Sequence, residues 1–151
     1  MRVLGIDPGC GHVEWHAWLH VPSVANRREH WAAKARRARE HRATAKAMTA
    51  DAMNRQSVSG KRIVVTITRM GRTLDSDNLA SACKAIRDGI ADALGIDDGD
   101  ARIEWRYAQG KAPAKPEALK YRRPAPSLIS VAIDWGAAMI AQQGHIENGG
   151  K

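Results

Sequence analysis

Residues 62–94 constrain the fold more than any other part of the chain, because the sequence pattern there changes once from strand to helix. Residues 62–70 (Arg-Ile-Val-Val-Thr-Ile-Thr-Arg-Met) are dense in the β-branched side chains that favour strands. A turn at residues 71–72 follows, and residues 77–94 then have the spacing of an amphipathic helix closed by Gly95. The chain therefore has to place at least one helix against a sheet.

Three further strands and one further helix are predicted from the same kinds of pattern. The strands, which alternate between apolar and polar side chains, are residues 13–20, 102–107 and 128–135. Residues 27–54 are rich in Ala, Arg and Lys and predict a long helix, capped by Ser23 or Asn26. The order β-α-β-α-β-β favours a single α+β domain with two main helices packed on one face of a mixed sheet.

The length of 151 residues suits one domain with its own core. We expect residues 1–11 to be an N-terminal extension or edge strand and residues 12–143 to form the domain, which ends in a short helix at 137–143. Residues 144–151 are expected to be a flexible tail. The stretch 109–127 is rich in Pro, Lys and Arg and predicts a loop.

The charge of the chain favours a polyanionic partner. The net charge is +8 and the pI is near 10.0, which is typical of proteins that bind nucleic acid. Nine Lys or Arg face three acids over residues 26–55, and five face Glu117 over residues 111–123. The predicted DNA-binding residues are Arg27, Arg28, Lys34, Arg36, Arg37, Lys111, Lys115, Arg122 and Arg123. A solvated helix face and a disordered linker are the alternative interpretations of these two segments.

Other classes of protein are disfavoured by what the sequence lacks. No apolar run approaches the roughly 18–20 residues that a membrane-spanning helix needs, and the first residues do not resemble a signal peptide. The cysteines, Cys10 and Cys83, are not spaced as zinc ligands. His12, His16 and His20 would lie too far apart along a strand to share one ion. We therefore expect a cytoplasmic protein without structural zinc.

Acidic side chains gather at both ends of the second predicted helix. The motif Asp75-Ser76-Asp77-Asn78 stands at its start, and Asp97, Asp98 and Asp100 follow its end. Clustered carboxylates repel one another unless a cation lies between them. Their oxygens are the ligands that Mg²⁺ prefers, with Mn²⁺ as a substitute. Capping of the helix is the alternative interpretation of the first pair.

One face of that predicted helix carries a narrow polar line. At about 100° per residue, Asp77, Ser81, Lys84 and Asp88 fall within an arc of roughly 60°, opposite an apolar stripe. A lysine in such a line is placed to neutralise the charge that develops on a phosphate. Two metal ions beside it could activate water and stabilise the leaving oxygen of a phosphodiester.

These motifs resemble the RusA family of Holliday-junction resolvases, especially its phage-borne members. The family pattern is Asp-x-Asp-Asn, a Lys on the following helix, and an Asp-Asp pair, which here reads Asp75 to Asn78, Lys84 and Asp97-Asp98. The resemblance spans roughly residues 13–133 and includes a Pro-Ser turn before the basic helix, with one extra residue before the Asn. The lysine departs from the family's best-known spacing, which would place it at Ser81.

The resemblance implies a homodimeric, Mg²⁺-dependent endonuclease that nicks four-way DNA junctions symmetrically, in a bacterium or a phage-infected host cell. It implies Asp75, Asp77 and Asp98 as metal ligands and catalytic residues, and Lys84 as the catalytic lysine. A homodimer also follows from the two-fold symmetry of the substrate, because paired nicks need two related active sites.

Two alternatives stay open. Residues 4–9 (Leu-Gly-Ile-Asp-Pro-Gly) resemble the first strand of RuvC-type resolvases, in which Asp7 would be a metal ligand on an RNase H-like fold. A non-catalytic basic DNA-binding protein, with acids that only cap helices, explains the charge equally well. Metal dependence separates the second alternative from a nuclease.

Overall fold

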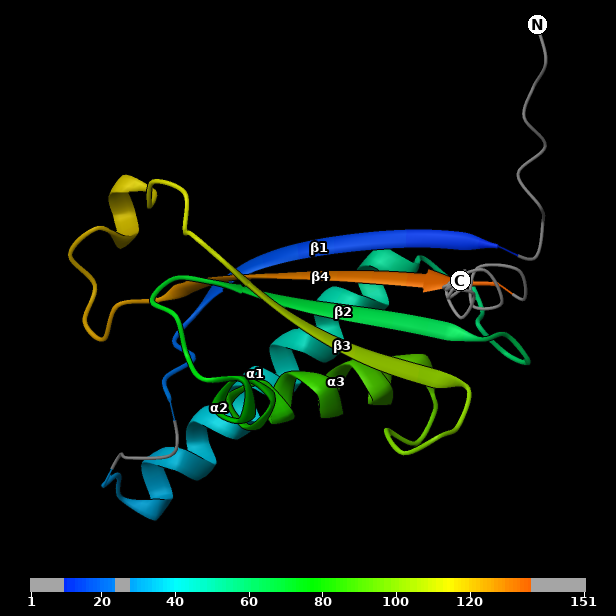
Figure 1. Cartoon of the computed structure of the whole chain (residues 1–151), viewed down its shortest axis with the longest axis horizontal. Helices are drawn as coiled ribbons and strands as arrows, with labels where there is room; N and C mark the ends of the chain where they lie inside the picture. Colours follow the sequence, from blue (N-terminus) through cyan, green and yellow to red (C-terminus); the bar gives the residue numbers. More distant parts are fainter. Residues whose placement is uncertain (1–9, 24–27, 137–151) are drawn as a thin grey trace, which may run out of the picture.

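The computed structural model describes residues 10–23 and 28–136, which form a mixed sheet with helices against one face (Figure 1). The strands are β1 (Gly11–Leu19), β2 (Ile63–Met70), β3 (Ile103–Gly110) and β4 (Ser127–Trp135). The helices are α1 (Trp31–Met53), α2 (Ser76–Ala82) and α3 (Lys84–Leu94), with a 3₁₀ turn, η1, at Glu117–Leu119. The prediction of an α+β domain with a mixed sheet is confirmed at this level.

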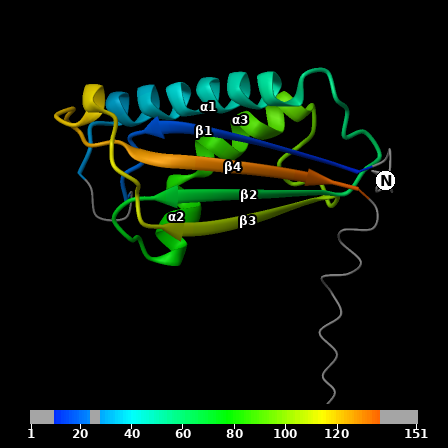
Figure 2. The ribbon, with the colours of Figure 1, turned by 90° about the horizontal axis from the view of Figure 1, so that it is seen from above.

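The sheet has the order β1-β4-β2-β3 (Figure 2). Strand β4 is antiparallel to both β1 and β2, whereas β2 and β3 are parallel, so that Val65 pairs with Ile133 on one side and Trp105 on the other. A parallel pair needs a crossover connection. The chain between β2 and β3 provides it with α2 and α3, which lie with α1 on one side of the sheet (Figure 1).

The core lies between that face of the sheet and the helices. Alternate residues of β4 are buried, and so are those of β2, where Val64 on the other face is buried as well. This is the pattern of period-two strands with one covered face. The indole nitrogen of Trp15, on β1, donates a hydrogen bond of 3.0 Å to Oγ1 of Thr49, on α1. Both side chains are buried. This bond satisfies two polar groups inside the core and ties the long helix to the sheet.

The four predicted strands are present, with ends that differ by up to three residues. The largest change is β3, which continues to Gly110 because residues 108–110 pair with residues 68–70 of β2. The predicted loop therefore begins at Lys111, and it contains η1. The short helix expected at 137–143, the tail at 144–151 and all but the last two residues of the extension at 1–11 lie outside the described residues.

The first helix begins later than predicted. It starts at Trp31 rather than Arg27, which lies outside the described residues together with Asn26. Its N-cap is His30, whose Nδ1 accepts a hydrogen bond of 3.3 Å from the backbone N–H of Ala32. Ser23 is therefore not the cap. An imidazole nitrogen here takes the role that a serine or asparagine side chain usually plays.

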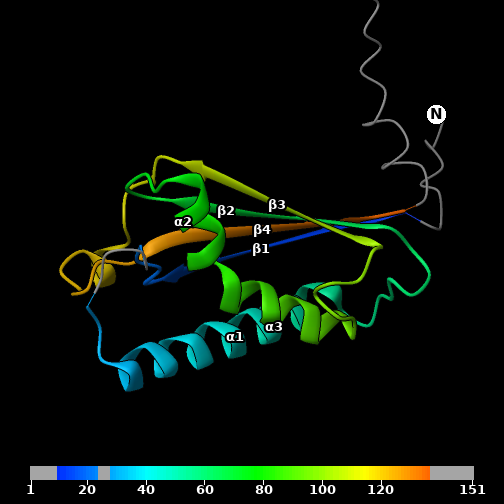
Figure 3. The same cartoon turned by 60° about the horizontal axis from the view of Figure 1, so that its bottom comes forward.

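A single helix over residues 77–94 was also predicted, and that prediction is wrong. The chain breaks at Cys83 into α2 and α3, and Cys83 has φ −91° and ψ 2°. Helix α3 packs closely on α1, since a Cβ on Gly89 would lie 2.3 Å from the carbonyl oxygen of Arg42. Helix α2 instead runs in a different direction, from the segment after β2 toward the start of α3 (Figure 3). One straight helix cannot follow both directions.

Among the described residues, no helix has the length and apolar character needed to cross a membrane.

Candidate functional site

Asp75 and Asp77 lie at the exposed start of α2. Asp75 occupies the N-cap position, but its side chain makes no capping hydrogen bond, and Asp77 is in the first turn. Neither carboxylate forms a hydrogen bond or ion pair within residues 10–23 and 28–136. Capping by these side chains, the alternative interpretation of the motif, therefore has no support in the structure. Both carboxylates are available to a ligand.

The chain just before Asp75 is fixed by a glutamine on β3. The side chain of Gln109 accepts a hydrogen bond of 2.8 Å from the N–H of Leu74 and donates one of 2.6 Å to its carbonyl. Gln109 is one residue from the end of β3, which lies beside β2. The start of α2 is thereby held against the neighbouring strand.

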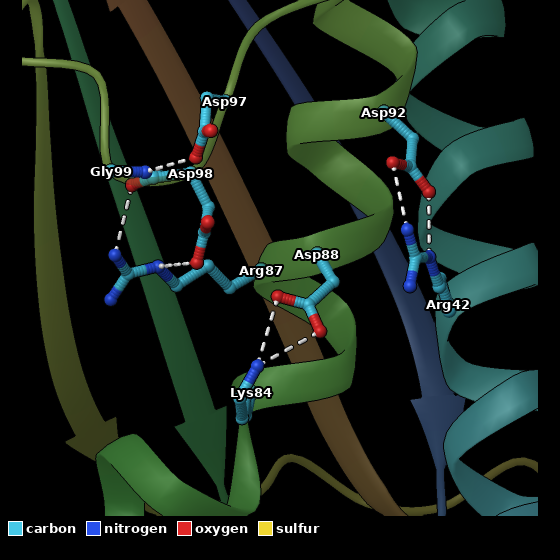
Figure 4. Close-up of polar contacts among 8 residues, drawn as sticks. All are labelled: Arg42, Lys84, Arg87, Asp88, Asp92, Asp97, Asp98 and Gly99. Carbon is cyan, nitrogen blue, oxygen red and sulfur yellow. Dashed lines mark hydrogen bonds and ion pairs between the residues drawn. The ribbon is translucent and has the colours of Figure 1, made fainter.

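Lys84 is the first residue of α3, directly after the break. Its Nζ lies 3.1 Å from Oδ2 of Asp88, one turn further on, and its side chain is 71% exposed (Figure 4). Lys84 and Asp88 thus share a face, as predicted. Ser81 lines a common pocket with both of them although it belongs to α2, whereas Asp77 does not line that pocket. An exposed i,i+4 pair contributes at most a few tenths of a kcal/mol, so Lys84 can exchange Asp88 for a phosphate at little cost.

In the acidic turn after α3, Asp97 and Asp100 are each engaged in local hydrogen bonds. Asp97 accepts a hydrogen bond of 2.9 Å from the N–H of Gly99. Hydrogen bonds from Arg102 lower the pKa of Asp100 to about 2, and the two side chains form an ion pair of 2.8 Å. These local roles agree with the omission of Asp100 from the predicted metal ligands.

Asp98 faces a cation that the sequence did not predict. Nε of Arg87, on α3, lies 3.4 Å from Oδ2 of Asp98, near enough for an ion pair but without hydrogen-bond geometry. Nη2 of Arg87 and the indole N–H of Trp105 each donate a bond of 2.9 Å to the Asp98 carbonyl. The Arg87 guanidinium also lies 4.9 Å from the Trp105 ring centre. The turn is firmly positioned, and Figure 4 shows Asp98 directed at Arg87.

Lys84 and Asp98 line one hollow, which we call the Lys84 hollow. It has a volume of about 300 Å³ between the helices and β3, and its lining residues are Ala80, Ser81, Lys84, Arg87, Asp98 and Tyr107. Asp75 and Asp77 are not among them. The structure therefore brings two of the four predicted catalytic residues together and places the other two at the start of α2.

The predicted metal ligands fit a cation only in part. Carboxylate oxygens suit Mg²⁺, and Asp75 and Asp77 are both unengaged. Across the described part of the chain, however, no three or more His, Cys, Asp or Glu side chains are gathered as a metal site requires. Asp98 would first have to leave Arg87.

The two predicted basic segments meet at a groove between α1 and the loop before β4, which we call the arginine groove. It has a volume of about 650 Å³, and its cations are Arg36, Arg37, Arg122 and Arg123. Glu29 and Glu40 also line it, and Glu29 forms an ion pair with Arg37. These cations come from segments more than 80 residues apart in the sequence, so their convergence is a property of the fold.

The remaining predicted DNA-binding residues lie in several places. Lys34 and Lys84 line the same hollow between α1 and the α2–α3 pair, whereas Lys111 and Lys115 line a separate pocket near the end of β2. Arg28 is exposed, and Arg27 is outside the described residues.

His12, the first of the three regularly spaced histidines, is paired with two acids on the sheet. His12 Nδ1 lies 2.5 Å from Asp134 and Nε2 lies 2.9 Å from Glu14. The hydrogen bond to Asp134 raises the pKa of His12. His12 and His16 are exposed, as the strand interpretation predicts.

Sequence reasoning missed Arg69, Arg87 and Gln109. A signal for Arg69 is present, because it shares the period-two face of Ile63, Val65 and Ile67, which are buried. A charged residue on the buried face of a strand is uncommon and indicates a function or a specific partner. Neither Arg87 nor Gln109 has such a signal.

No protein-family model matches the chain, and no curated protein matches it.

Proposed function

We propose that this protein is a Mg²⁺-dependent, structure-specific endonuclease of the RusA type that resolves four-way DNA junctions by paired nicks. The observation that carries the proposal is the pair of unengaged carboxylates, Asp75 and Asp77, at an exposed helix start in a chain of net charge +8. Two carboxylates this close together, with no partner among the described residues, offer oxygen ligands to a divalent cation. A metal bound by both side chains would account for their position.

The arginine groove and the hollow lined by Lys34 and Lys84 support a DNA substrate. Cations from α1 and from the loop at 122–123 line the arginine groove, and Lys34 and Lys84 line a second hollow between α1 and the α2–α3 pair. Each arginine contact to a backbone phosphate fixes the register of the DNA without reading its sequence. A protein of this kind is expected to recognise the shape of branched DNA rather than base order.

The residues have distinct roles in this proposal. Asp75 and Asp77, with Asp98 after it leaves Arg87, would hold Mg²⁺, for which Mn²⁺ is a possible substitute. When bound, the metal would activate the attacking water and stabilise the leaving oxygen. Lys84 would leave Asp88 and neutralise the developing charge on the scissile phosphate.

A homodimer is part of the proposal because of the substrate. A four-way junction has two-fold symmetry, so paired nicks require two copies of the site related by the same axis. Sedimentation at micromolar concentration tests this: a monomer that stays a monomer on the junction contradicts paired cleavage.

A non-catalytic DNA-binding protein is the second candidate, and two observations favour it. Asp98 is engaged by Arg87, and the described residues contain no gathered set of three metal ligands. A RuvC-type site would depend on Asp7, which lies outside the described residues.

Cleavage of a synthetic mobile four-way junction, with Mg²⁺ or with chelator, tests the proposal. Asp77→Asn should reduce cleavage by at least about 100-fold and leave junction binding intact, because it removes only a negative charge. Asp51→Asn is the matched control, since Asp51 is exposed and on α1. Binding without metal-dependent cutting would refute the nuclease. Equal cutting by Asp77→Asn would move the active site elsewhere.

A further inference from the structure

A pocket next to the carboxyl end of β2 is lined by cations and by no acid. It has a volume of about 420 Å³, and its charged lining residues are Arg69, Arg72, Lys111 and Lys115. We call it the basic pocket. It differs from the arginine groove, where Glu29 and Glu40 offset part of the positive charge.

Arg69 forms the buried part of this pocket. It is only 6% exposed. Its Nε donates a hydrogen bond of 3.0 Å to the Val21 carbonyl, and its Nη1 donates to the carbonyl of Arg72. Both acceptors are neutral backbone groups, and within the described chain no carboxylate pairs with Arg69. A guanidinium presents five N–H donors, so most of its donors are not used by these two bonds.

The surroundings of Arg69 do not neutralise its charge. Burial lowers the pKa of Arg69, but arginine stays protonated at physiological pH. The neighbouring Cys83 is no counter-ion, because burial raises the pKa of its thiol to about 11. A buried charge without a partner is costly. An anion from outside the chain would remove that cost.

The floor of the pocket places a hydroxyl near the guanidinium. A Cβ on Gly71 would lie 3.0 Å from Oγ of Ser127 and 3.6 Å from Nη1 of Arg69. Because Gly71 has no side chain, these two donors are not screened from the pocket by a methyl group. A hydroxyl and a guanidinium close together are common donors to phosphate oxygens.

We propose that the basic pocket binds a phosphate group, with Arg69 and Ser127 at its floor and Arg72, Lys111 and Lys115 at its rim. The position of the pocket favours an internucleotide phosphate of DNA as the bound group, and this part of the inference rests on the proposed function. Arg72 is three residues before Asp75, so a phosphate in the pocket would hold the DNA backbone beside the start of α2.

The first experiment uses inorganic phosphate and the full-length chain labelled with ¹⁵N. Phosphate should shift the amide signals of Gly71, Lys111 and Ser127. The double variant Arg72→Ala, Lys111→Ala should weaken this response about tenfold, and both residues are exposed, so the fold should survive. Arg62→Ala is the matched control: Arg62 is also exposed but precedes β2, at the opposite end of its eight residues, roughly 26 Å away.

The second experiment measures binding of the four-way junction without Mg²⁺ as salt is raised. If one DNA phosphate occupies the pocket, the double variant should flatten the slope of log Kobs against log salt by about 0.9, and Arg62→Ala should not. Phosphate-induced shifts with an unchanged slope would assign the pocket to a free phosphate instead. If neither the shifts nor the slope responds, the proposal is overturned.

The amide shifts and the salt dependence test the phosphate-binding pocket separately from the proposed nuclease activity. A chain that binds no DNA would refute the proposed function, yet the amide shifts would still decide whether the pocket takes phosphate. A chain that cuts junctions normally in the double variant, with no phosphate response, would refute the pocket alone.

Discussion

The hydrogen bonds between Gln109 and Leu74 should be measurable in stability. They are 2.8 and 2.6 Å long, and both residues are half-buried. A neutral hydrogen bond contributes about 0.5–1.5 kcal/mol, so Gln109→Leu is expected to lower the free energy of unfolding by about 1–3 kcal/mol. In a domain of this size, that corresponds to a fall in Tm of roughly 2–12 °C.

Gln109→Glu sharpens the same prediction because it changes one donor only. At pH 7 the new carboxylate still accepts from the Leu74 N–H, but it cannot donate to the Leu74 carbonyl, and its charge faces that oxygen. The folded state therefore favours the protonated acid, and the carboxyl pKa should be raised above its usual value near 4.3. The penalty is present above this raised pKa and is lost as the pH falls through it.

Urea unfolding of both variants and the wild type, at pH 7 and near pH 4, provides the assay. The difference between Gln109→Glu and wild type should shrink at the lower pH, whereas the difference for Gln109→Leu should not. A Gln109→Glu protein as stable as wild type at pH 7 would refute the reasoning, because the bond to the Leu74 carbonyl would then contribute nothing.

Two further predictions concern the helix interface and the sheet surface. In Gly89→Ala the added Cβ would meet the backbone oxygen of Arg42 at 2.3 Å, a clash that should cost up to about 3 kcal/mol. The gain in helix propensity offsets roughly 1 kcal/mol of this, so the net destabilisation should be up to about 2 kcal/mol. A stabilised variant in urea unfolding would contradict this prediction. His12→Gln should reduce stability near pH 5.5 and have little effect near pH 9. The hydrogen bond to Asp134 raises the pKa of His12 in the folded protein. Protonated His12 therefore stabilises the fold below the ordinary histidine pKa, and this stabilisation is lost as the pH rises through the pKa of the folded state. Equal effects of His12→Gln at both pH values would contradict this prediction.

The strands could be predicted from the sequence because their signal is local. Alternation of side chains depends only on which face of a strand is covered, and β4 carries it without interruption. The break at Cys83 could not be predicted in this way. The helical spacing of apolar residues continues across residues 77–94, so the local pattern contains no sign of the break. The close packing of α3 on α1 at Gly89 and Arg42, residues 47 positions apart, is likewise visible only in the fold.

The candidate site was predictable as a set of residue types but not as an arrangement. The acidic motif and the lysine are visible in the sequence, yet the pairing of Asp98 with Arg87 depends on how the turn after α3 folds back. Arg69 is the instructive case, because its position on the buried face of β2 is visible without a structure. The absence of any carboxylate partner is visible only in the fold.

The parallel pairing of β2 with β3 explains why the acidic motif and the basic pocket lie at the same edge of the sheet. Met70 pairs with Gly110, so both strands end at the same edge of the sheet. The segment after β2 carries Arg72 and then Asp75, and the segment after β3 begins at Lys111. Ligands of open sheets commonly bind where the carboxyl ends of parallel strands meet. An antiparallel β3 would have placed Lys111 at the far edge, and the acidic motif would then have no basic pocket beside it.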